Sequence, residues 1–104
     1  MTYSLPVHGP EFDGFEWDAD KSERCLAERG FDFDYVAKIF SGDFIEWADR
    51  RRDYGEERFV TVGTVDEREF TVIWTPRKST RRIISARPAS RSEREQLHGH
   101  RETQ

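Results

Sequence analysis

Arginine is the residue type in this chain with the most evident capacity for chemistry. Four arginines are predicted on or beside β-strands: Arg58, Arg77, Arg82 and Arg87. Lys78 follows Arg77 directly. The guanidinium group is planar, permanently charged and able to bind phosphate through two hydrogen bonds. An arginine in a covered region needs an anion. That anion is either a carboxylate of the same chain or an RNA phosphate, and the sequence leaves both open.

Cleavage of RNA would require proton transfer in addition to charge stabilisation. The reaction needs a base for the 2′-hydroxyl, stabilisation of the phosphate and an acid for the leaving 5′-oxygen. Arginine supplies only the second, because it stays protonated. Tyr54, Glu56 and Glu57 directly precede Arg58, and Lys78 follows Arg77. These residues are the candidates for proton transfer, and strand-edge packing or surface ion pairing is the structural alternative.

Metal, thiol and serine chemistry have little support in the sequence. His98 and His100 lack the spacing of two zinc ligands on one helix turn, and the single cysteine, Cys25, is expected to be a buried apolar residue. An acidic cluster could attract magnesium: Asp13, Glu16, Asp18 and Asp20. Favourable negative charge at the start of a helix explains this cluster more simply. We therefore expect no metal site.

Length and composition indicate one small domain with a very polar surface. The chain has 104 residues, which suits a single domain, and its 14 aromatic residues can supply a core although 37% of residues are charged. Residues 1–76 carry 9 Lys and Arg against 18 Asp and Glu, whereas residues 77–104 carry 8 against 3. With one cysteine and no apolar run long enough for a signal peptide or membrane span, we expect a cytoplasmic protein.

The N-terminal half is predicted to be mainly helical. Residues 1–14 are expected to be an irregular leader, and residues 15–17 can form a short edge strand. A helix should then run from a cap at Asp18 or Asp20 to Arg29, before Gly30. A second helix is predicted from Asp32 or Asp34 to Gly42, because its apolar residues recur at helical spacing: Phe33, Val36, Ile39 and Phe40.

The second half changes to the alternation of β-strands. Strands are predicted near residues 44–47, 58–65, 70–75 and 81–87, linked by hairpins. Strict alternation would place Arg81, Ile83, Ser85 and Arg87 on one face of the last strand, and Arg82, Ile84 and Ala86 on the other. Ser90 and Glu93 form a capping box for a last helix with Leu97 as its apolar anchor, and residues 98–104 are expected to be a disordered tail.

The predicted fold class is therefore α+β. Two N-terminal helices should pack on an antiparallel sheet of about four strands, followed by a C-terminal helix. Residues 15–97 should form the single domain.

Five short motifs occur in an order and spacing that closely resemble the BrnT family. The similarity spans about residues 15–97 and is carried by these segments: Phe15-Glu16-Trp17-Asp18, Arg29-Gly30-Phe31, residues 49–59 (DRRRDYGEERF), Trp74-Thr75-Pro76-Arg77, and residues 82–89 (RIISARPA). Each motif alone is weak, but all five together are distinctive.

The resemblance implies a function and partners. BrnT proteins are type II toxins with a fold similar to RelE-type ribonucleases, and they inhibit translation by cutting RNA without a metal or organic cofactor. Each is bound by BrnA, an antitoxin with a ribbon-helix-helix domain, and the complex reaches operator DNA through that antitoxin. We expect no interaction with membranes.

The candidate site residues follow from the family positions and from their neighbours. The arginines at positions 58, 77, 82 and 87 match basic positions of the family, and Glu56 matches its Gly-Glu pair. We predict a catalytic group and an RNA-binding group: Arg58, Arg82, Glu56 and Tyr54 for catalysis, and Arg77, Lys78 and Arg87 for binding. The alternative is a non-catalytic module that binds nucleic acid or a partner and acts as a co-repressor subunit.

Overall fold

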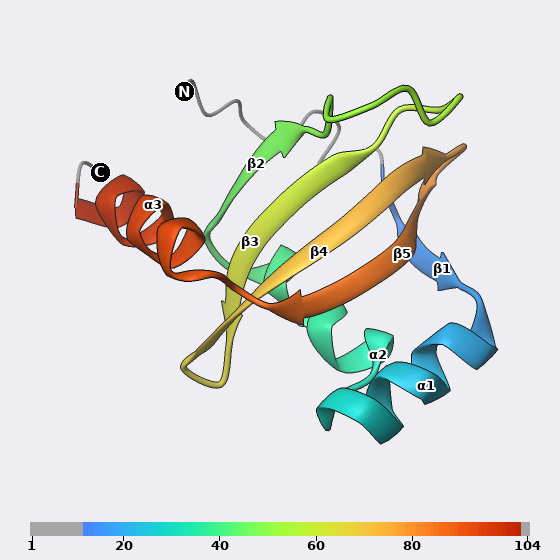
Figure 1. Ribbon diagram of the computed structural model, residues 1–104, viewed down its shortest axis with the longest axis horizontal. Helices are drawn as coiled ribbons and strands as arrows, with labels where there is room; N and C mark the ends of the chain where they lie inside the picture. Colours follow the sequence, from blue (N-terminus) through green and yellow to red (C-terminus); the bar gives the residue numbers. More distant parts are fainter. Residues whose placement is uncertain (1–11, 103–104) are drawn as a thin grey trace.

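Five β-strands form one mixed sheet in the computed structural model, which describes residues 12–102. The strands lie in the order β1-β5-β4-β3-β2 (Figure 1). Their bounds are Gly14–Trp17 for β1, Phe44–Ala48 for β2, Phe59–Val65 for β3, Arg68–Arg77 for β4 and Thr80–Pro88 for β5. Most of the predicted leader, residues 1–11, lies outside the described residues, and Gly14 already belongs to β1.

Strands β2 to β5 form an antiparallel ladder because each connection returns the chain beside the strand that precedes it. The β3–β4 turn consists of Asp66 and Glu67, which have φ values of 50° and 67°. Positive φ at both central residues is what the twist of a two-residue hairpin requires. The four strands predicted from alternation and turn residues are all present.

Strand β1 makes the predicted four-stranded antiparallel sheet wrong. It is a fifth strand, and it pairs with β5 in parallel, with Glu16 opposite Arg82 and Trp17 opposite Ile83. Antiparallel neighbours can be recognised from short turns, whereas a parallel pair needs a long crossover. Here that crossover includes both N-terminal helical segments and strands β2 to β4, so no local signal connects β1 with its partner.

The prediction of two N-terminal helices is also wrong. Only α1, Ala19–Arg29, has several turns; Asp18 caps its start and Gly30, with φ of 87°, ends it. The second predicted helix is one α-turn, α2 (Phe33–Val36), continued by the 3₁₀ helix η2 (Ala37–Ser41). Aromatic and β-branched residues favour helix weakly, yet a spacing of three residues lines one side of either helix type. The expected stripe is therefore still buried at Phe33, Val36 and Ile39.

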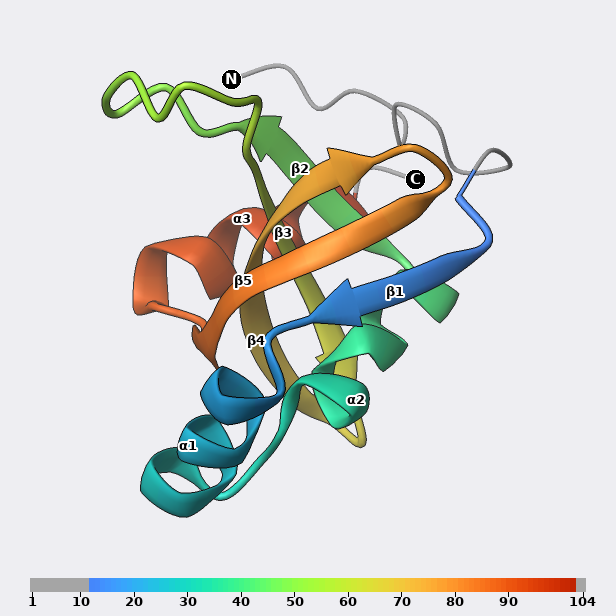
Figure 2. The same cartoon turned by 90° about the vertical axis from the view of Figure 1, so that its right-hand side faces the viewer.

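Helix α3, Arg91–Glu102, packs on the opposite face of the sheet from α1 and α2 (Figures 1 and 2). The Ser90 hydroxyl accepts from the Glu93 N–H, and the Glu93 carboxylate accepts from the Ser90 N–H, which is the predicted capping box. Leu97 is fully buried against Ile45 and Val62. The helix continues to Glu102, so residues 98–102 are helical where we predicted a disordered tail. No helix within residues 12–102 is both long and apolar enough to span a bilayer.

A bulge in β5 changes which of its side chains share a face. Ile73 pairs with Ser85 whereas Trp74 pairs with Ile83, so Ile84 is an extra residue. Ile83 and Ala86 consequently both face the helix-side core. The strict alternation that placed Arg87 with Arg81 is wrong, because the bulge puts Arg87 on the face of Arg82.

Buried polar groups cross the sheet on the side covered by α1 and α2. The hydroxyl of Thr61 donates to Glu46 and accepts a 2.8 Å hydrogen bond from the indole N–H of Trp74. Arg81 is 6% exposed, and its guanidinium lies 4.3 Å from the Phe40 ring centroid and 5.0 Å from that of Trp74. Burial lowers the pKa of Arg81, and the nearby charge of Glu46 opposes that change. The core therefore contains a buried arginine whose loss of hydration is offset only in part by the charge of Glu46.

Gly63 in β3 allows η2 to pack directly on the sheet. A Cβ atom at this position would lie 2.8 Å from Cβ of Ile39 and 3.3 Å from Cβ of Phe44. We expect Gly63→Ala to lower the free energy of unfolding by about 1–3 kcal/mol, because the backbone of η2 or β2 must move. Chemical denaturation measures the change. Gly99→Ala in α3 is the control, since nothing lies within 4 Å of that Cβ position, and equal stability of the two variants would contradict this packing.

Candidate functional site

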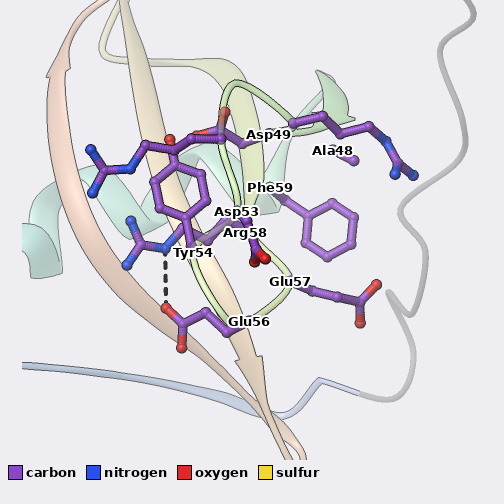
Figure 3. A pocket seen from close by; sticks show the side chains of 10 residues that line it. Ala48, Asp49, Asp53, Tyr54, Glu56, Glu57, Arg58 and Phe59 are labelled. Atoms are coloured by element: carbon purple, nitrogen blue, oxygen red, sulfur yellow. Dashed lines mark hydrogen bonds and ion pairs between the residues drawn. The ribbon is translucent and has the colours of Figure 1, made fainter.

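Four of the seven predicted site residues gather at the loop between β2 and β3. The guanidinium carbon of Arg58 lies 4.1 Å from the ring centroid of Tyr54, and its Nε donates to Glu56 Oε2 over 3.0 Å. Arg77, from the end of β4, donates to the other oxygen of Glu56 over 3.2 Å. Figure 3 shows the Tyr54 ring beside Arg58, with Glu56 beneath the guanidinium group. The structure thus brings Tyr54, Glu56, Arg58 and Arg77 together.

The loop holds this arrangement through its own polar contacts. The Asp49 N–H donates to the Arg58 carbonyl over 2.8 Å, which extends the β2–β3 ladder by one step. Arg51 donates two 2.8 Å hydrogen bonds to the Asp49 carboxylate, which lowers the pKa of Asp49. Gly55, with φ of 73°, turns the chain between Tyr54 and Glu56. A pocket of about 420 Å³ lies beneath the loop.

Glu56 is held as a carboxylate by two arginines. Burial raises its pKa, but hydrogen bonds from Arg58 and Arg77 outweigh burial, so the pKa of Glu56 lies below its ordinary value. A carboxylate in this state can accept a proton but has none to donate near neutral pH. The neighbouring Tyr54, whose ring lies against Arg58, adds a hydroxyl group that can donate or accept a hydrogen bond.

Arg58 and Arg82 flank Thr75 on the face of the sheet opposite α1. Phe59 pairs with Trp74 and both belong to the helix-side core, so Arg58, one residue earlier, points to the other face. Thr75 pairs with Arg82, and its hydroxyl donates to the Glu57 carbonyl over 2.6 Å. β3 and β5 are both interior strands of the sheet. Arg82 reaches Glu16 of β1 over 3.4 Å.

The remaining two predicted residues lie away from the loop cluster. Lys78 lies in the β4–β5 turn with φ of 52° and is exposed. Arg87 lies toward α3, where it donates hydrogen bonds of 2.7 and 2.8 Å to Glu93. The structure therefore places Arg87 on the correct face but ties it to the start of α3.

Glu93 is a structural partner whose effect on stability can be measured. Burial raises its pKa, but hydrogen bonds from Arg87, Ser90 and Thr71 outweigh burial and lower the pKa to about 2 from an ordinary value of 4.5. A lowered pKa in the folded state stabilises the protein above about pH 4.5, and that stabilisation disappears as the pH falls toward 2.

We expect Glu93→Gln to lower the free energy of unfolding at pH 7 by on the order of 2–3 kcal/mol. The variant should also lose less stability than the parent protein between about pH 4.5 and pH 2. Urea denaturation across this range measures both effects. Glu95→Gln in the same helix is the control, because its ion pair with Arg91 is exposed. Identical acid dependence in the parent protein and Glu93→Gln would contradict the assignment.

The sequence interpretation missed the carboxylates that accompany the arginines. Glu16, Asp49 and Glu93 each pair with an arginine on or beside this face, and only Glu93 had a local signal, its capping box. Carboxylates of the chain are therefore the anions that the structure shows. The four predicted arginines all pair with carboxylates, yet their side chains remain 25–45% exposed: Arg58, Arg77, Arg82 and Arg87. They are therefore accessible to a phosphate as well.

A small α+β protein with an exposed, arginine-lined sheet face belongs to a class suited to binding phosphate-rich ligands. The family model for the ribonuclease toxin BrnT of type II toxin–antitoxin systems matches residues 17–93. The chain therefore belongs to this family of ribonuclease toxins, which confirms the family predicted from its five motifs. No curated protein sequence matches the chain.

Proposed function

We propose that this chain cleaves single-stranded RNA in the cytoplasm without a metal ion and so inhibits translation. The observation that carries the proposal is the pair Arg58 and Arg82, which flank Thr75 on the sheet face opposite α1, with Tyr54 and Glu56 at one end. Arg82 is held within β5 and Arg58 directly precedes β3, and charge that is already in position stabilises a developing phosphate charge without reorganisation. Family membership supports ribonuclease activity.

Each of the seven predicted site residues has a proposed role. Arg58 and Arg82 stabilise the phosphate in the transition state, and Arg77, Lys78 and Arg87 hold the RNA backbone. The phosphate of the RNA takes the place of the Glu56 carboxylate beside Arg58, and the released carboxylate accepts the proton of the 2′-hydroxyl. The Tyr54 hydroxyl donates a proton to the leaving 5′-oxygen.

Cleavage by the purified chain in EDTA tests this mechanism. We expect a single-stranded RNA to be cut at the same rate with and without the chelator, because arginine supplies the positive charge at the phosphate. The apparent affinity for RNA should fall with salt concentration, since phosphate contacts release counterions. Gel analysis of labelled RNA measures both. Activity that requires added Mg²⁺ would contradict the mechanism.

The proposed partner is a BrnA-like ribbon-helix-helix antitoxin, through which the complex would bind operator DNA. Charge supports this choice, since an acidic or amphipathic antitoxin segment would complement the basic residues after position 76. Antitoxin should bind the purified chain and stop RNA cleavage.

Deletion of residues 90–104 is a poor test of the contact, because it removes the buried Leu97. Arg91→Glu preserves the core and should weaken the complex; unchanged affinity would argue against contact at this part of α3.

A non-catalytic co-repressor subunit is the second candidate function. The carboxylates paired with the site arginines favour it, because they already satisfy much of the positive charge. Expression of the chain alone separates the two functions. Growth arrest with loss of bulk translation supports the ribonuclease, whereas unchanged growth together with operator binding in complex with antitoxin supports the co-repressor.

A further inference from the structure

A second pocket, of about 400 Å³, adjoins the loop of the candidate site. Trp47, Val60 and Ile73 line it, and its charged edge includes Arg51 and Arg87. Trp47 of β2 pairs with Val60 of β3, which pairs with Ile73 of β4, so these side chains form one row across the sheet. We call this cavity the Trp47 pocket.

The Trp47 pocket is one step along the strands from the arginines of the candidate site. Ile73 precedes Thr75 by two residues, so its row neighbours the row of Arg58, Thr75 and Arg82 on the same face. Two residues of a strand span about 7 Å. The segment 48–50 lines both this pocket and the pocket beneath the loop. A ligand bound at Arg58 and Arg82 would therefore extend naturally into the Trp47 pocket.

The geometry points to a subsite in which the Trp47 pocket holds a nucleobase next to the phosphate bound by Arg58 and Arg82. Unpaired bases of single-stranded RNA bind proteins by stacking on aromatic side chains. Trp47 is partly buried and packs on the apolar cluster beneath α3, which includes Ile45 and Leu97, so its ring is supported from behind. This inference rests on the proposed RNA substrate and adds a site that recognises its bases.

The chemistry of the pocket suits a base better than an apolar side chain of a protein partner. Its apolar part is limited to one row, and the Arg51–Asp49 and Arg87–Glu93 pairs surround that row with charge. Arg51 is 70% exposed and can donate hydrogen bonds to the ring nitrogen and carbonyl acceptors of a base. A leucine or phenylalanine would fill the apolar part but offer nothing to these polar groups.

The test compares binding of two RNA-like ligands by two variants. One ligand is a short 2′-O-methyl oligoribonucleotide, which cannot be cleaved through its 2′-oxygen; the other has the same backbone and charge but abasic sugars. Trp47→Leu should weaken binding of the first about ten- to hundredfold and leave binding of the second unchanged. Trp47→Phe should retain most of the affinity. Fluorescence anisotropy of labelled oligonucleotides gives the affinities, and thermal melting checks folding.

Trp17→Leu is the matched control, because Trp17 lies on the opposite face of the sheet, covered by α1 and α2, beside Phe33. It should not alter the preference for the base-bearing ligand. The inference is overturned if the parent protein binds both ligands equally, if Trp47→Leu weakens both equally, or if only antitoxin affinity falls. Base-dependent binding without cleavage of ordinary RNA would support the subsite while refuting the ribonuclease proposal, so the two failures are distinguishable.

Discussion

Arg58→Ala should reduce kcat/KM for RNA cleavage by about 10²–10³, the usual effect of losing one preorganised donor to a transition-state oxyanion. Arg58→Lys should be nearly as slow, because a point charge cannot reproduce two parallel hydrogen bonds to phosphate. Both variants should stay folded. Glu56, the partner of Arg58, is 26% exposed and retains Arg77, so removal of Arg58 leaves no buried unpaired charge.

Cleavage rates and melting temperatures must be measured on the same preparations. Arg91→Ala is the matched control, since it removes an exposed arginine of α3 that is 87% accessible, and it should cleave at the parent rate. A folded Arg58→Ala protein that cleaves RNA at the parent rate would refute the assigned role. Loss of folding in Arg58→Ala would instead indicate a structural role. Folded but inactive protein that still binds antitoxin makes Tyr54 and Glu56 the next residues to replace.

Arg81→Met should lower the free energy of unfolding by about 3–5 kcal/mol. Replacing its neighbour, Arg82→Met, should lower the free energy of unfolding by about 1 kcal/mol or less. The two arginines are adjacent in sequence but lie on opposite faces of β5. Arg81 is buried among three aromatic rings, and its charge interacts favourably with that of Glu46, which is 1% exposed. Arg82 pairs with Glu16 at the surface, where water already stabilises both charges.

Urea denaturation of both variants measures this difference. A third variant, Arg81→Met combined with Glu46→Gln, should recover part of the lost stability, because it also removes the buried negative charge of Glu46. Equal destabilisation by Arg81→Met and Arg82→Met would contradict the buried pair. Failure of the double variant to recover any stability would show that Arg81 acts through its aromatic contacts alone.

Local signals allowed much of the sheet to be predicted. Hairpins are specified by turn residues and alternation within a few positions, so β2 to β5 could be located from sequence. The partner of β1 could not, because its pairing with β5 depends on contacts between residues more than 60 positions apart. The length of the second α-helix was overestimated, because Phe33, Val36 and Ile39 lie on one side of either an α-helix or a 3₁₀ helix.

The candidate site was predictable where its members are neighbours in the chain. Tyr54, Glu56 and Arg58 lie within one loop, and their proximity follows from their positions. The approach of Arg77 to Glu56 and of Glu16 to Arg82 depends on strand register, which the sequence pattern did not reveal. One extra residue, Ile84, decided the face of Arg87, and alternation alone cannot show where such a residue is inserted.

The parallel pairing of β1 with β5 also sets the order in which the chain can fold during synthesis. β1 is made first, but its only partner in the described sheet is the last strand to be made. The ladder that places Arg82 beside Thr75 forms at that late point as well. Since contacts distant in sequence form slowly, we expect a nascent chain to lack its arginine face until β5 has left the ribosome. A chain stalled with residues 80–88 still in the exit tunnel should be cut readily by protease and should not cleave RNA.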